Sequence, residues 1–167
     1  EFEKKFEQSP DSGSGHPEFL AMQFAVSDDR KSIKINTPKL WGRLRQKLDD
    51  FDLPKINIDS GPMPSNFMDL LFAPADPIAN PIISTDDCDV RGILGVVSWG
   101  ILACRPAEAF PSAALARRVH IPTASVIKCL LHLCAYCLEH EHDELIFKAD
   151  KDARLVSYVD SSWANDP

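Results

Sequence analysis

Seven cationic side chains stand within eighteen residues and could bind the phosphate backbone of a nucleic acid. They are Arg30, Lys31, Lys34, Lys39, Arg43, Arg45 and Lys47. No Asp or Glu lies among them. Because Arg and Lys neutralise phosphates and release counterions, this strip predicts a salt-dependent backbone contact. The alternative interpretation of the same cluster is a solvated surface.

Asp160 could take part in metal-ion chemistry. It follows residues 154–159, whose apolar character is typical of a strand buried on both faces. A carboxylate at the end of such a strand is well placed to hold Mg²⁺, because this hard cation prefers oxygen ligands. A lone aspartate in this position is also a common turn residue, so both interpretations remain open.

A cysteine- and histidine-rich stretch raises the question of a zinc site. Its members are Cys129, His132, Cys134, Cys137, His140 and His142. Their spacing matches no standard module of paired zinc ligands. On one helix, Cys129 and His140 would lie about 16 Å apart, too far to share an ion. The sequence therefore favours reduced thiols that pack in a core.

The overall composition is that of a soluble globular domain. The chain has 167 residues, 44% of them hydrophobic and 26% charged, with 18 Lys and Arg against 25 Asp and Glu for a net charge of −7. It has no uncharged apolar run of about 18 residues, so we expect no membrane span. Five cysteines, an odd number, predict free thiols and an intracellular setting, cytoplasmic or nuclear.

The first third of the chain predicts a β-hairpin that leads directly into a helix. Residues 18–26 and 32–36 have strand composition, and the polar residues 27–31 between them predict a turn. Thr37 and Pro38 are typical of a helix N-cap and first helical residue. The apolar residues that share one face of this helix are Leu40, Trp41, Leu44 and Leu48.

Further elements are predicted along the rest of the chain. Acidic residues near Asp86 suit the start of a helix whose apolar period ends before Arg105 and Pro106. The other elements expected are a proline-rich connection over 52–80, a short helix over 107–118, a helix over 123–139, and strands over 145–148 and 154–160. The helix over 123–139 is apolar almost all round, which predicts burial on most of its circumference.

Several segments, in collinear order, resemble one family of proteins. Residues 155–166, L-V-S-Y-V-D-S-S-W-A-N-D, are similar to the start of the ribonuclease H domain in Copia-type retrotransposon polyproteins. Residues 89–106, which end in Arg105 and Pro106, resemble the same family's pattern Y-R-S-L-V-G-S-L ending in T-R-P. Residues 24–36 and 39–51 resemble its reverse-transcriptase hairpin and the helix that follows.

The resemblance implies an α+β fold: a β-hairpin plus thumb-like and connection-like helices, ending in the first strands of a ribonuclease H-like domain. Residues 1–53 would hold the end of the palm, the hairpin and the thumb-like helix. Residues 54–85 would form a proline-rich connection and residues 86–150 a helical connection region. Residues 151–167 would form the first strand of a truncated ribonuclease H-like domain.

The resemblance also implies a function. The parent activity would be RNA-directed DNA synthesis with degradation of the RNA strand, using Mg²⁺. The seven cations would contact an RNA or DNA template–primer within a larger polyprotein or protein assembly. Asp160 would be the first of the acids that hold two metal ions in the ribonuclease H site.

The departures from the family pattern set limits on that function. The paired-aspartate polymerase motif would lie before residue 1, and the other ribonuclease H acids would follow residue 167. Leu131, His132 and Ala135 stand where the family carries cations, and Ser162 stands where it has Asp. We therefore expect no catalysis by this chain alone. A domesticated, non-catalytic module that binds protein or RNA is one alternative, and an unrelated α+β domain is another.

Overall fold

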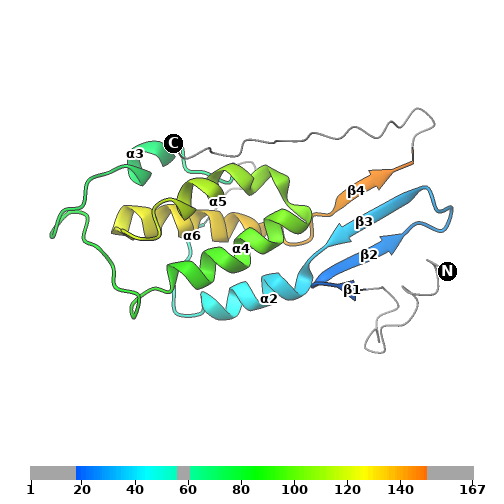
Figure 1. The fold of residues 1–167 in the computed structure, drawn as a ribbon, viewed down its shortest axis with the longest axis horizontal. Helices are drawn as coiled ribbons and strands as arrows, with labels where there is room; N and C mark the ends of the chain where they lie inside the picture. The colour runs from blue at the N-terminus through cyan, green and yellow to red at the C-terminus, as the bar shows by residue number, and fades with distance from the viewer. Residues whose placement is uncertain (1–17, 56–60, 150–167) are drawn as a thin grey trace, which may run out of the picture.

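A four-stranded antiparallel sheet projects from one end of a group of helices (Figure 1). The computed structural model describes residues 18–55 and 61–149. The α+β class expected from the sequence is confirmed for these residues. None of the described helices is both long and apolar enough to cross a membrane.

The sheet has the order β1-β2-β3-β4, and each strand is antiparallel to its neighbour. The strands are β1 (Glu18–Phe19), β2 (Met22–Val26), β3 (Ser32–Asn36) and β4 (Leu145–Lys148). The predicted hairpin of β2 and β3 is confirmed. The single strand expected over 18–26 is wrong, because Leu20 and Ala21 adopt positive φ angles of 53° and 66° and turn the chain between β1 and β2.

The partner of β4 comes from the other end of the described chain. Ile33 of β3 lies opposite both Val26 of β2 and Phe147 of β4, so these three side chains share one face of the sheet. The strand expected over 154–160 lies outside the described residues. The pairing of β3 with β4 is therefore a long-range contact that local sequence patterns do not predict.

The helices correspond closely to the predicted ones. They are α2 (Pro38–Lys47), α3 (Phe67–Leu71), α4 (Val90–Cys104), the 3₁₀ turn η1 (Pro106–Glu108), α5 (Ala109–Ala116) and α6 (Ala124–Glu139). The helix α4 begins at Val90 rather than near Asp86, because the side chain of Asp89 caps it and accepts a hydrogen bond from the N–H of Gly92 at 2.9 Å. The short helix α3 lies inside the stretch that was expected to be irregular.

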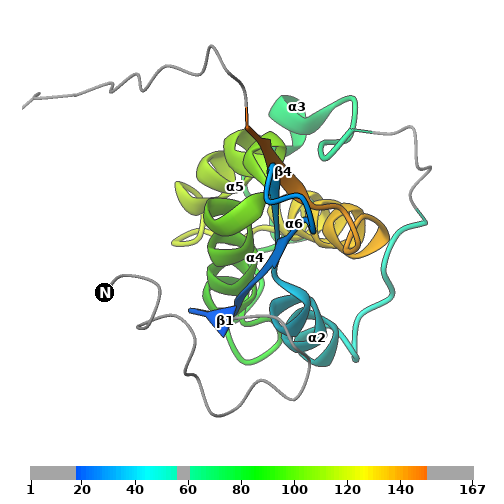
Figure 2. The same cartoon turned by 90° about the vertical axis from the view of Figure 1, so that its right-hand side faces the viewer.

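The core lies where α4 and α6 meet α2, α3 and α5 (Figures 1 and 2). The buried face of α6 includes Leu130, Leu133 and Cys134, none of which is exposed, so its predicted burial is confirmed. Trp41 of α2 packs directly over Gly100 of α4, where a Cβ atom would lie 2.5 Å from the indole ring. A glycine at position 100 is thus what allows α2 and α4 to approach each other.

A single core joins the first three segments expected from the resemblance. Trp41, Phe67 and Leu130 come from the three different segments and belong to one cluster of buried side chains. The predicted starts of two helices are confirmed, since Thr37 directly precedes α2 and Thr123 directly precedes α6. Of these two threonines, Thr123 caps its helix with its side chain and Thr37 does not. The buried Thr37 hydroxyl instead lies 3.6 Å from the thiol of Cys104.

Candidate functional site

The predicted phosphate-binding strip divides between the hairpin turn and α2. Arg30 and Lys31 are exposed in the turn, and Arg30 has a φ angle of 54°. Asp29 accepts hydrogen bonds from the Ser27 hydroxyl at 2.7 Å and from the backbone N–H of Lys31 at 3.1 Å. These two bonds, the Ser27 bond first, lower the pKa of Asp29, so the turn carries anionic as well as cationic groups.

Lys34, Arg45 and Lys47 of the strip form ion pairs with acids that are distant in the sequence. The pairs are Lys34 with Glu144 (Nζ–Oε2 2.8 Å), Lys47 with Asp89 (Nζ–Oδ2 3.0 Å) and Arg45 with Glu141 (Nη2–Oε1 2.9 Å, with a second contact from Nη1). The hydrogen bond from Arg45 lowers the pKa of Glu141. Each pair reduces the positive charge that the strip can offer to a phosphate.

The remaining cations of the strip are Arg30, Lys31, Lys39 and Arg43, and all four are exposed. Lys39 and Arg43 lie one turn apart on α2, on the side opposite the buried Trp41 and Leu44. Arg30, Lys31 and Arg43 have no acidic partner within 4 Å among the residues that the structure describes.

Lys148 adds a cation beside the hairpin turn that the sequence analysis did not include. It is exposed and lies opposite Ser32 in the β3–β4 register, and the N–H of Ala149 donates to the carbonyl of Lys31 at 2.6 Å. No signal in the sequence could have placed it there, because the β3–β4 pairing spans more than a hundred residues. Arg30, Lys31 and Lys148 therefore form a cationic cluster, here called the hairpin cluster, at the end of the sheet far from the helices (Figure 1).

All five cysteines are buried free thiols, as expected of packing residues. Burial raises the pKa of Cys129 to about 11 and that of Cys137 to about 12, so both stay protonated at neutral pH. Within the described ranges, no group of three His, Cys, Asp or Glu side chains is placed to hold a metal ion. The histidine rings have other contacts: His132 Nε2 lies 3.2 Å from the carbonyl of Gly61, and His140 stacks on Tyr136.

Asp160 lies outside the described residues. Its predicted role as a catalytic residue and Mg²⁺ ligand therefore stays a prediction.

Arg105 and Glu108 form a buried ion pair. The sequence analysis did not predict this pairing. Arg105 is 5% exposed and Glu108 is 1% exposed, and Arg105 Nη2 donates to Glu108 Oε1. Arg105 Nη1 donates to the carbonyl of His140 at 2.7 Å, and the guanidinium lies 5.7 Å from the ring centroid of Trp41. The pair thus links the end of α4 to α2 and to the end of α6.

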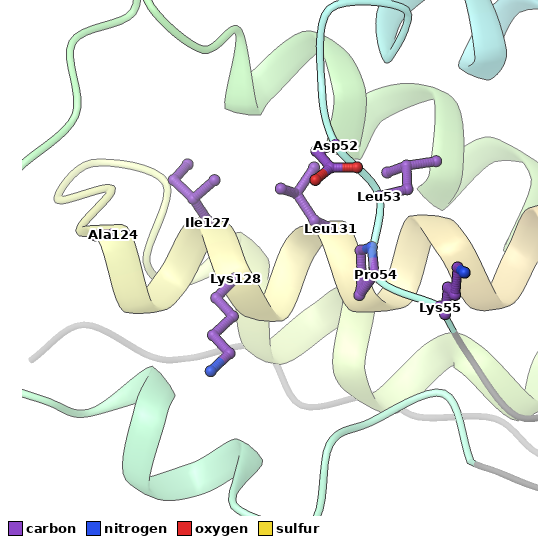
Figure 3. A pocket seen from close by; sticks show the side chains of 8 residues that line it. All are labelled: Asp52, Leu53, Pro54, Lys55, Ala124, Ile127, Lys128 and Leu131. Carbon is purple, nitrogen blue, oxygen red and sulfur yellow. The ribbon is translucent and has the colours of Figure 1, made fainter.

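A pocket of about 510 Å³ lies between residues 52–55 and α6. In Figure 3 the segment from Asp52 to Lys55 crosses α6, with the side chain of Leu131 beside Asp52 and the amine of Lys128 pointing away from Asp52. The described lining contains apolar side chains, one carboxylate and two amines, but neither histidine nor cysteine.

Comparisons of this chain with protein-family models, with curated proteins and with solved structures give no match.

Proposed function

We propose that this chain is the thumb and connection part of a Copia-type reverse transcriptase, and that it contacts the backbone of an RNA or DNA template–primer. The observation that carries the proposal is the set of exposed cations without acidic partners in the described ranges, Arg30 and Lys31 at the hairpin turn and Arg43 on α2. Phosphates bind to such groups without specific base contacts.

The proposal is supported by the order of the elements along the chain. A hairpin, a helix that starts at Pro38, and helices that flank the Arg105–Pro106 sequence follow one another as the resemblance implies. In the parent enzyme, Asp160 would hold Mg²⁺ together with further carboxylates that the resemblance places after residue 167. The exposed cations would contribute backbone binding to the RNA-directed DNA synthesis of the parent enzyme.

Binding to an RNA–DNA duplex over a range of salt concentrations tests this function. We expect affinity to fall steeply with salt, with a log–log slope near 0.9 for each phosphate contact. The variant Arg30→Ser/Lys31→Ser should lower the slope by about 2 if both side chains contact phosphates. The matched control is Arg91→Ser/Arg117→Ser, which removes the same charge from exposed positions elsewhere.

Equal losses in the two double variants would contradict the hairpin interface, because they would show that only net charge matters. Binding that does not depend on salt would also contradict it.

A non-catalytic, protein-binding module derived from such an element is the second candidate. It is favoured by the neutralised cations, since Lys34, Arg45 and Lys47 are held by carboxylates. It is also favoured on α6, where Ala135 is buried at a position that carries a cation in the resembled family. This candidate predicts no measurable duplex binding at physiological salt.

A further inference from the structure

The strand β4 forms one edge of the sheet. Its neighbour on one side is β3, and no strand of the described residues lies on its other side (Figure 1). The register with β3 is continuous from Leu145 to Lys148, so β4 has no bulge, and it contains no proline. Bulges and prolines are common devices that prevent an edge strand from pairing with another strand. The edge of β4 is therefore open to such pairing.

The backbone groups at this edge belong to the even-numbered residues of β4. The N–H of Ala149 donates to the carbonyl of Lys31 at 2.6 Å, so Ala149 directs its backbone groups toward β3. In an antiparallel ladder this direction alternates from one residue to the next. The N–H and C=O groups of Ile146 and Lys148 therefore point away from β3, toward the position of a further strand.

The side chains of β4 are mostly apolar and only partly covered. Ile146 is 46% exposed and Phe147 is 55% exposed. Phe147 shares its face of the sheet with Val26 and Ile33, which are also exposed. Leu145 lies on this face as well, because it is two residues from Phe147 in the strand. A strand with the same alternation would extend this apolar face across the edge.

One register between two β4 strands matches the backbone groups and the charges together. With Ile146 opposite Ile146 of a second copy, the outward backbone groups of each strand face those of the other. In this register, Glu144 of each copy lies opposite Lys148 of the other copy. A centre at Leu145 or at Phe147 instead leaves Glu144 without Lys148 opposite it. The flanking charges are thus complementary to those of an antiparallel copy of the same strand.

Both charged groups can take part in such a contact. Lys34 contacts Glu144 at Oε2, with an Nζ–Oε2 distance of 2.8 Å, so Oε1 can accept from a second copy. Lys148 is exposed and has no acidic partner within 4 Å in residues 18–55 and 61–149. An antiparallel copy therefore adds an opposite charge at each end of β4.

We propose that β4 is a dimerisation strand, which pairs antiparallel with β4 of a second copy of this chain and joins the two sheets. Backbone hydrogen bonds at Ile146 and the cross-strand contact of Leu145 with Phe147 of the second copy hold the strands together. Because β4 has four residues, the interface is small, and we expect a dissociation constant in the micromolar range. The proposal goes beyond the proposed function, which depends on cations at the hairpin turn and on α2 that take no part in this contact.

Sedimentation equilibrium of the 167-residue protein, from low to high micromolar concentrations, tests the proposal. We expect a reversible equilibrium between monomer and dimer. Lys148→Glu should raise the dissociation constant about tenfold, because two opposed ion pairs become like-charge contacts. The matched control is Lys128→Glu, which makes the same charge change at an exposed position on α6 and should leave the equilibrium unchanged.

Reversal of both charges tests the register. Glu144→Lys alone should weaken the dimer, whereas Glu144→Lys/Lys148→Glu should restore it, because the opposed pairs return with their signs exchanged. Ile146→Pro removes an N–H that points away from β3, so it should weaken the dimer and leave the pairing with β3 intact. If proline disturbs β4 itself, the charge variants decide the test.

Wild-type protein that stays monomeric at high micromolar concentrations would overturn the proposal, and would mean that another segment or another protein covers this edge. A dimer that responds equally to Lys148→Glu and Lys128→Glu, or that the double charge reversal does not restore, would also overturn it.

Discussion

The Arg105–Glu108 pair shows how much depends on a residue whose role is not visible in the sequence. Its two side chains are close in the sequence, but their burial arises from α2, from the end of α6, and from the chain that leads to β4. A buried ion pair contributes little compared with a well-packed apolar pair, yet the loss of one partner leaves an unpaired charge that is costly. The pair is therefore a sensitive point for stability.

Removing the cation from this pair should destabilise the fold strongly. We expect Arg105→Met to lower the free energy of unfolding by about 3–5 kcal/mol, because the Glu108 carboxylate then stays buried without a partner. The double variant Arg105→Met/Glu108→Met should recover part of this loss. Urea denaturation of Arg105→Met, of Glu108→Met and of the double variant measures the coupling between the two side chains. The carbonyl of His140 loses its donor in both variants that lack Arg105, so that loss cancels.

Additive losses in this cycle would show that the two side chains act independently.

In the phosphate-binding strip, too, the sequence predicts which residues are exposed but not which residues they contact. The sequence correctly placed its exposed cations on a hairpin and on the outer side of a helix, because local patterns determine both. It did not predict that Glu141, Glu144 and Asp89 would neutralise three of them. Those contacts form only when the residues between α6 and β4 reach β3 and α2, and when the start of α4 reaches the end of α2, and no local signal encodes that arrangement.

At the scale of the elements, helices with clear ends and an apolar period were predicted well. Thr37 with Pro38, and Thr123, marked the starts of α2 and α6, and Arg105 with Pro106 marked the end of α4. The five-residue helix α3 was missed because it is too short to show a period of 3.6 residues. The interruption at Leu20 and Ala21 was missed because neither residue type favours positive φ.

The helix α6 should be the element least tolerant of truncated side chains. Leu133 is fully buried, and we expect Leu133→Ala to lower the free energy of unfolding by about 2–5 kcal/mol, since it leaves a cavity in the core. Lys128→Ala on the exposed side of the same helix is the control and should change stability by less than about 0.5 kcal/mol. Thermal or urea denaturation measures both. A small effect of Leu133→Ala would mean that α6 is not the centre of the core.

At the scale of the whole molecule, the helices and the sheet have different roles. The helices supply one continuous core, whereas the sheet carries the hairpin cluster away from it (Figure 1). The excess of 25 acidic over 18 basic residues opposes polyanion binding over most of the surface. A nucleic acid would therefore contact the protein through the exposed cations of the hairpin cluster and α2.

The last prediction concerns catalysis by this chain. A two-metal mechanism needs several carboxylates around a pair of ions, and the resemblance assigns one residue of this sequence, Asp160, to that role. Mg²⁺ keeps most of its waters and binds weakly to a single carboxylate, and Ser162 supplies no further charge. We therefore expect no cleavage of an RNA–DNA hybrid by the purified protein at millimolar Mg²⁺, and no difference between the wild type and Asp160→Asn. Gel analysis of an end-labelled hybrid measures this, with an active ribonuclease H in the same buffer as the positive control. Hybrid-specific cleavage that disappears in Asp160→Asn would show that other acids complete the site, for instance from a second copy of the chain.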